Sequence, residues 1–237
     1  MIDGIELAAS GLDAYANVQD VIARNLANAN TIGFKKNTVS FKSILTEVDG
    51  VETSNLQTNY GVDQSNGKLT YTGNNLDIAI DGDGFFTLET DKGMRYTRNG
   101  QFQLSSNGEI ITATGSKLLG QSGPIIIPKG GREIVIDNKG VVRADGKDVG
   151  ELIITNFTDL TRLVPTGDSM FTAPLETINE NGDVKFRVAH GYLERSNVNA
   201  VMEMVDMIAN MRSYEASTGV IKTFSDLMER LISSQTI

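Results

Sequence analysis

The residues of this sequence that could do chemistry are few. The only histidine is His190, and the sequence offers no partner with which it could form a catalytic triad or a metal site. Asp81 and Asp83 lie in an Asp-Gly-Asp-Gly run, but Phe85 and Phe86 follow directly, where a calcium loop needs more oxygen ligands. This run is therefore typical of a hairpin turn rather than of a calcium site.

Other catalytic patterns do not occur in the sequence. There is no phosphate-binding Walker loop, no dinucleotide fingerprint and no Gly-x-Ser-x-Gly elbow. The chain has no cysteine, which excludes disulfides, thiolate metal sites and cysteine nucleophiles. We therefore predict that the protein is not an enzyme, that it has no cofactor, and that it has no catalytic, cofactor-binding or metal-ligating residues.

Charge and hydropathy narrow the possible partners. The 21 basic and 30 acidic side chains of the 237 residues give a net charge of −9. An acidic chain without a basic cluster is a poor candidate for binding nucleic acid. No apolar run approaches the ~20 residues of a membrane-spanning helix, so we expect no direct membrane insertion. A cleaved signal peptide has a basic stretch followed by an apolar one. We find no such pattern in the sequence, so export would need another route.

Long helices are predicted at both ends of the sequence. Asp3 and Glu6 form a capping box at the start of a helix over 3–28. A second helix is predicted over 199–233, with Asn199 as its N-cap. The spacing of three and four residues is typical of a coiled-coil seam, and the second seam has an irregular step between 211 and 214. The first seam contains Ile5, Ala8, Leu12, Tyr15, Gln19, Ile22 and Leu26; the second contains Val201, Met204, Ile208, Met211, Tyr214, Ser217, Ile221, Phe224, Met228 and Leu231.

Between the helices the sequence changes character twice. Residues 35–75 are polar with no clear period, which favours an extended connector. From residue 76 to 193, short β-like runs alternate with Asn-Gly and Asp-Gly dipeptides, which suit tight turns between antiparallel strands. We therefore predict an α+β fold in which long N- and C-terminal coiled-coil-like helices flank a mainly antiparallel β domain, a sandwich or distorted barrel, with an extended connector. The predicted domains are a terminal helical domain of 1–34 plus 199–237, a connector of 35–75 and a β-rich domain of 76–198.

The spacing alone does not determine what the two seams pack against. The helices could pack on the β domain or on each other within one molecule. They could also pack against other copies, because an isolated pair of long helices on a polar connector buries little surface.

Three motifs resemble the bacterial flagellar axial proteins, the family of rod, hook and hook-associated proteins. They are "ARNLANANTIGFKK" (23–36), "LDIAIDGDGFF" (76–86) and "LERSNVNAVMEMVDMIANMRSYEAS" (193–217). In the first, Asn25, Leu26, Ala27, Asn28, Thr31, Gly33 and Phe34 match the family pattern, whereas Ile32 replaces the common proline. The β region is too small for a hook protein or filament cap. The proximal-rod member is resembled most by the motifs "SNVNAV" (196–201), "DMIA" (206–209), "YTRNG" (96–100) and "GPIIIP" (123–128). The connector is short and the extra segment typical of the distal-rod member does not occur, so that member is the alternative.

This resemblance implies a structural role. Such proteins are exported unfolded by the flagellar type III apparatus, without a cleaved signal, and assemble helically into the rod, the drive shaft in the periplasmic space. The implied partners are other copies of the chain, other rod proteins and the export apparatus, with the terminal helices forming an inner tube. A less favoured hypothesis is a β-domain binding module that its helices dimerise.

The seams and the first motif together predict the subunit-interface residues. They are Leu12, Tyr15, Ile22, Asn25, Leu26, Asn28, Gly33, Phe34, Val201, Met204, Ile208, Met211, Tyr214, Ile221, Phe224 and Leu231.

Overall fold

The computed structural model describes the whole chain except residues 1, 49–50, 129, 131–132, 180–185 and 235–237. The chain folds into two compact units, which are described separately. The helical unit comprises Met1–Ala27, Asn37–Asp63 and Val198–Ile237, and the β unit comprises Asn28–Lys36 and Gln64–Asn197. None of the described helices is both long and apolar enough to span a membrane.

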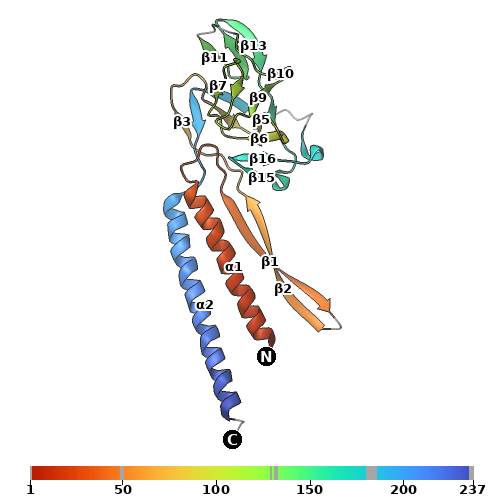
Figure 1. Cartoon of the computed structure of the whole chain (residues 1–237), viewed down its shortest axis with the longest axis vertical. Helices are drawn as coiled ribbons and strands as arrows, with labels where there is room; N and C mark the ends of the chain where they lie inside the picture. Colours follow the sequence, from red (N-terminus) through yellow and green to blue (C-terminus); the bar gives the residue numbers. More distant parts are fainter. Residues whose placement is uncertain (1, 49–50, 129, 131–132, 180–185, 235–237) are drawn as a thin grey trace. The chain divides into compact units, whose positions relative to one another are not determined.

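The helical unit contains two helices and a two-stranded ribbon. Helix α1 (Ile2–Ala27) lies along helix α2 (Ala200–Ser234), and α2 continues past the first turn of α1 (Figure 1). The predicted N-cap of α2 is confirmed: the Asn199 side chain accepts hydrogen bonds from the backbone N–H of Val201 (3.1 Å) and of Met202 (3.3 Å). These bonds satisfy backbone donors that have no partner inside the helix.

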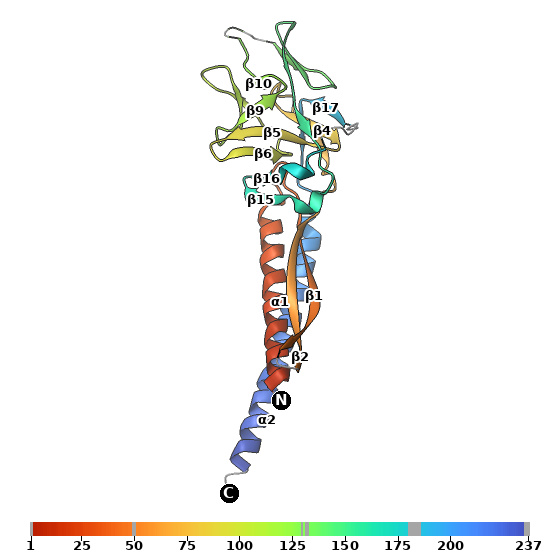
Figure 2. The ribbon, with the colours of Figure 1, turned by 90° about the vertical axis from the view of Figure 1, so that its right-hand side faces the viewer.

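The ribbon consists of strands β1 (Asn37–Val48) and β2 (Val51–Val62) and lies beside α1 (Figure 2). Its antiparallel register places Val39 opposite Tyr60 and Phe41 opposite Thr58. Because side chains alternate between the faces of a strand, these four share one face. A two-stranded ribbon is only marginally stable by itself, so packing on α1 is what supports it.

The β unit is built from antiparallel strands in four sheets. The largest has nine strands in the order β15-β16-β6-β5-β9-β8-β7, with β10 beside β9 and β14 beside β5. The others are β11-β12-β13, β17-β4 and β18-β3. Their bounds are β3 (Leu69–Tyr71), β4 (Ile78–Gly82), β5 (Phe85–Thr90), β6 (Gly93–Thr97), β7 (Gln103–Leu104), β8 (Ile110–Ile111), β9 (Lys117–Gly120), β10 (Gly123–Pro124), β11 (Ile134–Ile136), β12 (Val141–Ala144), β13 (Lys147–Glu151), β14 (Ile154–Thr155), β15 (Val164–Gly167), β16 (Met170–Thr172), β17 (Phe186–His190) and β18 (Tyr192–Glu194), with two 3-10 helices, Leu160–Arg162 and Leu175–Thr177.

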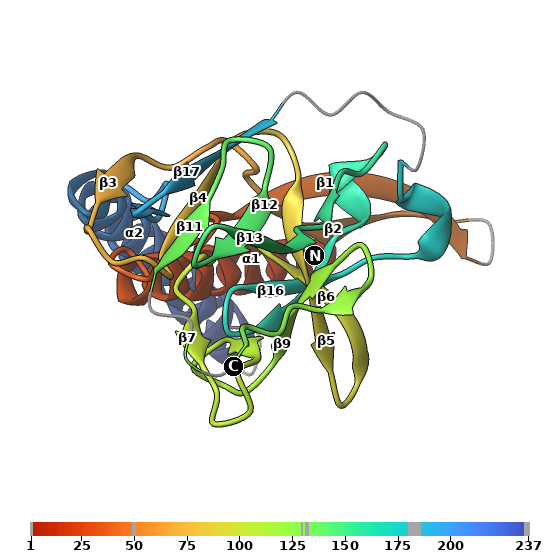
Figure 3. The same ribbon diagram turned by 90° about the horizontal axis from the view of Figure 1, so that it is seen from above.

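One hydrophobic core holds these sheets together. Phe86 of β5 is fully buried and meets Phe102 edge to face, with ring centroids 5.6 Å apart. Val142 of β12 and Val188 of β17 belong to the same cluster, and Figure 3 shows the three-stranded sheet beside β4 and β17. Apolar residues from separate sheets therefore share a single interior.

The Asp-Gly-Asp-Gly run does not form the expected hairpin. Strand β4 pairs with β17, whereas β5 pairs with β6, β9 and β14, so the run carries the chain from one sheet to another. Gly82 and Gly84 have φ values of 121° and 110°, which residues with a Cβ rarely adopt.

The predicted fold class is wrong in its coiled-coil-like helices and its extended connector. The structure has two helices flanking a mostly antiparallel β domain, but most residues of the predicted α2 seam are exposed rather than interlocked with α1. The less exposed positions of α2 follow another stripe, which contains Glu203, Met207, Asn210, Ser213, Ser217 and Ile221. This stripe is mostly polar, so a pattern of apolar residues could not identify it.

The connector and the β domain also differ from the expectation. The polar segment after α1 folds back on itself as the β1–β2 ribbon instead of running extended to the β domain. The described strands of the β unit form four sheets, rather than the two facing sheets of a sandwich or the closed sheet of a barrel.

Candidate subunit interface

The first three turns of α2 carry an apolar surface that nothing in the described part of the helical unit covers. Its side chains are between 49 % and 69 % exposed. A contiguous apolar surface of this kind is characteristic of an interaction site, and methionines adapt readily to the shape of a partner. We call this surface the α2 patch: it contains Val201, Met202, Met204, Val205, Ile208 and Met211.

Polar contacts hold the other side of α2 against α1. The Asn210 side chain donates hydrogen bonds to the backbone carbonyl of Tyr15 and to Oε1 of Gln19, both at 2.9 Å. Ile208 is two residues from Asn210 and hence about 200° away around the helix. The contact with α1 therefore directs the α2 patch away from α1.

Asn25, the first asparagine of the N-terminal motif, connects three elements of the helical unit. Its amide nitrogen donates to Oε2 of Glu203 in α2 (3.2 Å) and to the backbone carbonyl of Asn37 in β1 (2.9 Å). Its amide oxygen accepts from the N–H of Asn37 at 2.8 Å. Asn25 and Glu203 are buried, so both side chains are used inside one chain.

A groove of about 470 Å³ runs between the two helices. Three of the predicted interface residues, Tyr15, Met211 and Tyr214, line it, and Met211 also belongs to the α2 patch. The groove is therefore continuous with that patch. Its other lining residues are Ala16, Gln19, Asp20, Asn210 and Glu215.

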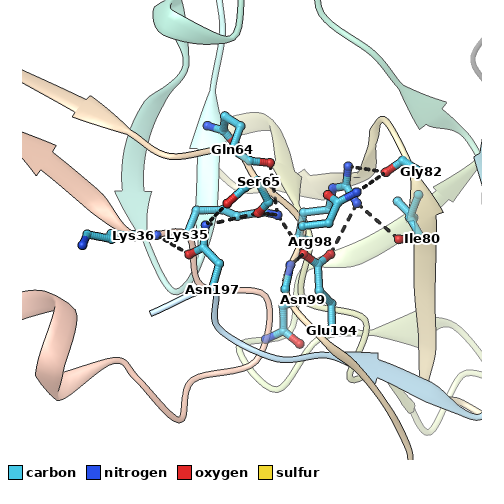
Figure 4. Close-up of polar contacts among 12 residues, drawn as sticks. Lys35, Lys36, Gln64, Ser65, Ile80, Gly82, Arg98, Asn99, Glu194 and Asn197 are labelled. Atoms are coloured by element: carbon cyan, nitrogen blue, oxygen red, sulfur yellow. Dashed lines mark hydrogen bonds and ion pairs between the residues drawn. The ribbon is translucent and has the colours of Figure 1, made fainter. Parts of the chain in front are cut away.

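The β unit contains a buried charge cluster (Figure 4). Oε1 of Glu194 lies 2.7 Å from Nζ of Lys35, and Oε2 lies 3.3 Å from Nη1 of Arg98. The three side chains are only 1 % to 4 % exposed. Burial lowers the pKa of the Arg98 guanidinium from its ordinary value, and the neighbouring Glu194 carboxylate opposes this shift. Charges removed from water in this way need such partners.

The same cluster fastens three distant chain segments to one another. Lys35 Nζ donates to the Ser65 carbonyl (2.8 Å), and the N–H of Gly67 donates to Oε1 of Glu194 (2.8 Å). The N–H of Lys36 donates to Oδ1 of Asn197 at 2.7 Å. Segments 33–36, 64–67 and 194–197 are thereby held at one place in the β unit.

Gly33 of the N-terminal motif lies so close to the backbone of Asn99 that there is no room for a side chain. Its φ is 65°, and a Cβ built on it would lie 2.3 Å from the backbone nitrogen of Asn99. Its N–H donates to the carbonyl of Glu194 at 2.8 Å. A side chain here would push this segment away from the charge cluster.

The predicted interface residues fall into three groups. Ile22, Asn25 and Gly33 are buried within the chain, whereas Leu12, Tyr15, Leu26, Asn28, Phe34 and Ile221 are partly exposed. The exposed group is Val201, Met204, Ile208, Met211, Tyr214 and Phe224. The side chain of Leu231 lies outside the described residues. That these residues contact neighbouring subunits remains a prediction.

Sequence reasoning missed the residues of the charge cluster. Lys35 and Glu194 both lie within the motifs that suggested the family, but 159 positions separate them. A signal was available in "YLER", where Glu194 follows directly after Leu193 at the end of a β-like run. His190, the other candidate for chemistry, has Nε2 2.9 Å from the carbonyl of Asn75, and the described residues contain no cluster of acidic and histidine side chains suited to a metal ion.

Comparisons with known proteins match three parts of the chain to family models. Residues 5–35 match the model of flagella basal body rod proteins. Residues 79–144 match the D1 domain of the flagellar hook protein FlgE/F/G, and residues 189–234 match the C-terminal part of the flagellar basal body rod FlgEFG protein. The models fall in the same order as the three motifs.

Similar curated proteins align over nearly the whole chain. The flagellar basal-body rod protein FlgG of Bacillus subtilis is 30 % identical over 264 residues, with 98 % of each chain covered. The flagellar basal-body rod protein FlgF of Escherichia coli is 35 % identical over 226 residues, with 89 % of each covered. FlgF of Rhizobium meliloti is 30 % identical over 236 residues, covering 98 % of this chain and 97 % of its own.

Proposed function

From the premise that this chain belongs to the family of flagellar basal-body rod proteins, we propose that it builds the proximal part of the rod by helical self-assembly. The chain is a structural subunit of the flagellar basal-body rod, and it assembles with other rod proteins. The position within the rod, the neighbours and the interface residues are the proposed part.

The length of the chain supports the proximal position. The FlgF alignments run over 226 and 236 residues, whereas the FlgG alignment runs over 264. FlgG therefore has at least 27 positions (264 − 237) that this chain lacks. An extra segment is typical of the distal-rod member, so the shorter chain supports the proximal position.

The α2 patch is the single observation that carries the assembly proposal. Its six apolar side chains remain exposed in a lone chain, where they face water at a free-energy cost. A neighbouring copy that covers the patch removes this surface from water. In this proposal copies join head to tail, because such contacts propagate as a helix when they do not close into a ring.

In this proposal the terminal helices form the inner tube of the rod and the β unit lies outside. Export by the flagellar type III apparatus, without a cleaved signal, precedes assembly. The helices then gain most of their stability from neighbouring subunits, since folding upon binding suits a chain that must cross a narrow export path.

Replacing Ile208 with Asp tests the role of the α2 patch. A charge placed in the covered interface would be buried without a partner, so we expect incorporation into purified basal bodies to fall by at least ~10-fold, about 1.4 kcal/mol of binding. The free energy of unfolding of the lone chain should change by less than ~0.5 kcal/mol, because Ile208 is exposed there.

Ser225→Asp is the matched control. It adds one negative charge at an exposed position of the same helix, outside the α2 patch, and we expect normal incorporation. If Ile208→Asp builds rods as well as Ser225→Asp does, the α2 patch is not a subunit interface.

A further inference from the structure

The outer edge of strand β2 has no role in the function proposed above. β2 pairs with β1 in a sheet of two strands, so each strand of the ribbon has one edge without a neighbouring strand. An unpaired edge presents backbone N–H and C=O groups to which another strand can bind. The two outer edges of the ribbon are not equivalent, and this difference concerns what can bind to β2.

The outer edge of β1 is occupied at its start by a side chain of α1. The Asn25 amide donates to the backbone carbonyl of Asn37 (2.9 Å) and accepts from the N–H of the same residue (2.8 Å). These are the two bonds that a residue of a third strand would make, so the side-chain amide takes the place of a strand there. The backbone N–H and C=O of Asn37 therefore point away from β2 and toward α1.

The direction of the Asn37 backbone also assigns the outward groups of β2. Along an antiparallel pair of strands, hydrogen-bonded and non-hydrogen-bonded pairs of residues alternate. Asn37 lies opposite Val62 in a non-hydrogen-bonded pair, and the pairs that contain Tyr60 and Thr58 follow at every second position. The N–H and C=O of Thr58, Tyr60 and Val62 therefore point to the outer edge of β2.

These outward groups have no partner within the described part of the chain. No hydrogen bond from outside the ribbon reaches the backbone of Thr58, Tyr60 or Val62 among the described residues. Tyr60 is 62 % exposed, and Asn59 and Gly61 on either side of it are also exposed. In a lone chain this edge is therefore open to water.

The edges of the largest sheet differ from this one. That sheet ends at β15, which has four residues and contains Pro165, and at β7, which has two residues. Short strands and proline are common means of preventing further pairing at an edge. By contrast, β2 has twelve residues, its register with β1 is unbroken, and its sequence "VETSNLQTNYGV" contains no proline and no lysine. Its outer edge is thus a long, regular template for another strand.

We propose that an extended segment of a neighbouring rod subunit binds to the outer edge of β2 as a third strand of the ribbon. The proposal rests on the proposed function, because it requires subunits to meet in the rod. The edge itself selects the chemistry of its partner, since N–H and C=O groups that alternate along an extended strand are matched by another extended polypeptide. β2 of another copy is not this segment, because identical edges meet only across a two-fold axis, which copies joined head to tail do not have.

Thr58→Pro tests whether the outward backbone groups of β2 are used. Proline removes the N–H of residue 58, and it is tolerated at an edge where that N–H points outward. Thr58→Ala is the matched control, since it shortens the side chain and keeps the N–H. We expect Thr58→Pro to be incorporated into purified basal bodies several-fold less than Thr58→Ala. Equal incorporation of the two variants would overturn the proposal.

Amide exchange of the lone chain checks that the ribbon is intact in Thr58→Pro. Asn59 and Gly61 belong to the pairs that are hydrogen-bonded to β1, so the N–H of Gly61 should exchange at the same rate in Thr58→Pro as in Thr58→Ala. Asn59→Pro removes a bond to β1 and should make the Gly61 N–H exchange faster. If Thr58→Pro opens the ribbon as Asn59→Pro does, the assignment of the outward groups is wrong and the proposal fails.

Cross-linking in basal bodies identifies the partner independently of the proline variants. Tyr60→benzoylphenylalanine places a photoreactive group on an exposed side chain of β2, and side chains directly opposite on paired strands lie about 4.5–5.5 Å apart. We expect a cross-link to a rod protein, mapped by mass spectrometry to a segment other than β2. No cross-link, a cross-link to β2 of another copy, or a cross-link to a protein outside the rod would overturn the proposal. Failure of the proposed function looks different, because the unmodified chain would itself be absent from basal bodies.

Discussion

Two isoleucines illustrate how the β unit differs from the helical unit. Ile80 in β4 is 1 % exposed and packs in the shared core, whereas Ile208 in α2 is 54 % exposed. Burial is equally favourable for the two side chains, but within one chain only Ile80 is buried. The β unit has a closed apolar core, whereas the helical unit leaves the six side chains of the α2 patch exposed, and in the proposed assembly a neighbouring copy covers them.

In their buried polar groups, by contrast, the two units are alike. The β unit buries the Lys35–Glu194–Arg98 cluster, and the helical unit buries the Asn25–Glu203 contact. Both units therefore use specific hydrogen bonds to fix how chain segments meet. In the proposed assembly, these polar contacts fix the shape of each subunit, and a neighbouring copy covers the α2 patch.

The largest expected contrast between the units is in amide hydrogen exchange of the lone chain. Amides of α2 over residues 212–230 should exchange at least ~1,000-fold faster than those of β5, a difference of about 4 kcal/mol in opening free energy. The reason is that β5 is at the centre of the core, whereas this part of α2 is mostly exposed. Equal protection of the two elements would contradict the proposal that the helices gain most of their stability from neighbouring subunits.

The second contrast concerns the charge cluster. Glu194→Gln keeps the shape of the side chain but leaves Lys35 and Arg98 buried without a counter-charge, so we expect the β unit to lose about 3–5 kcal/mol of unfolding free energy. Urea unfolding followed by tyrosine fluorescence measures this loss. Glu176→Gln, at an exposed ion pair with Arg162, should show no measurable change. Similar losses in the two variants would show that the buried cluster has no special role.

The smallest contrast removes one methyl group from each of the two isoleucines. Ile80→Val should lower the free energy of unfolding by about 0.5–1.5 kcal/mol, since it leaves a cavity in a closed core. Ile208→Val should change it by less than ~0.5 kcal/mol in the lone chain. Thermal unfolding measures the free energy of unfolding of both variants. A larger decrease for Ile208→Val than for Ile80→Val would mean that the Ile208 side chain is buried in the fold.

The sequence allowed the helices and most β-like runs to be predicted because their signals are local. The capping of α2 by Asn199 depends on residues within three positions of it. The β1–β2 ribbon was missed although Asp49-Gly50, a dipeptide typical of two-residue turns, separates Val48 from Val51. The polar composition of both strands concealed the alternation that would have indicated a hairpin.

What could not be predicted depends on distant contacts. The side of α2 that meets α1 is chosen by Asn210, whose partners are 191 and 195 positions away. Apolar spacing indicated the exposed stripe instead, because it cannot distinguish a surface kept for a partner from one buried in the same chain. Glu194 likewise found its partners at separations of 159 and 96 positions.

The adjacency of Gly33 and Glu194 has a mechanical consequence. Their backbones are joined by a 2.8 Å hydrogen bond, so the incoming and outgoing strands of the polypeptide enter the β unit at neighbouring points. Tension applied through both termini would load this bond and the Lys35–Glu194 ion pair first, in parallel, and would reach the sheets only after these had yielded. These two contacts would thus shield the sheets of the β unit from strain along the polypeptide.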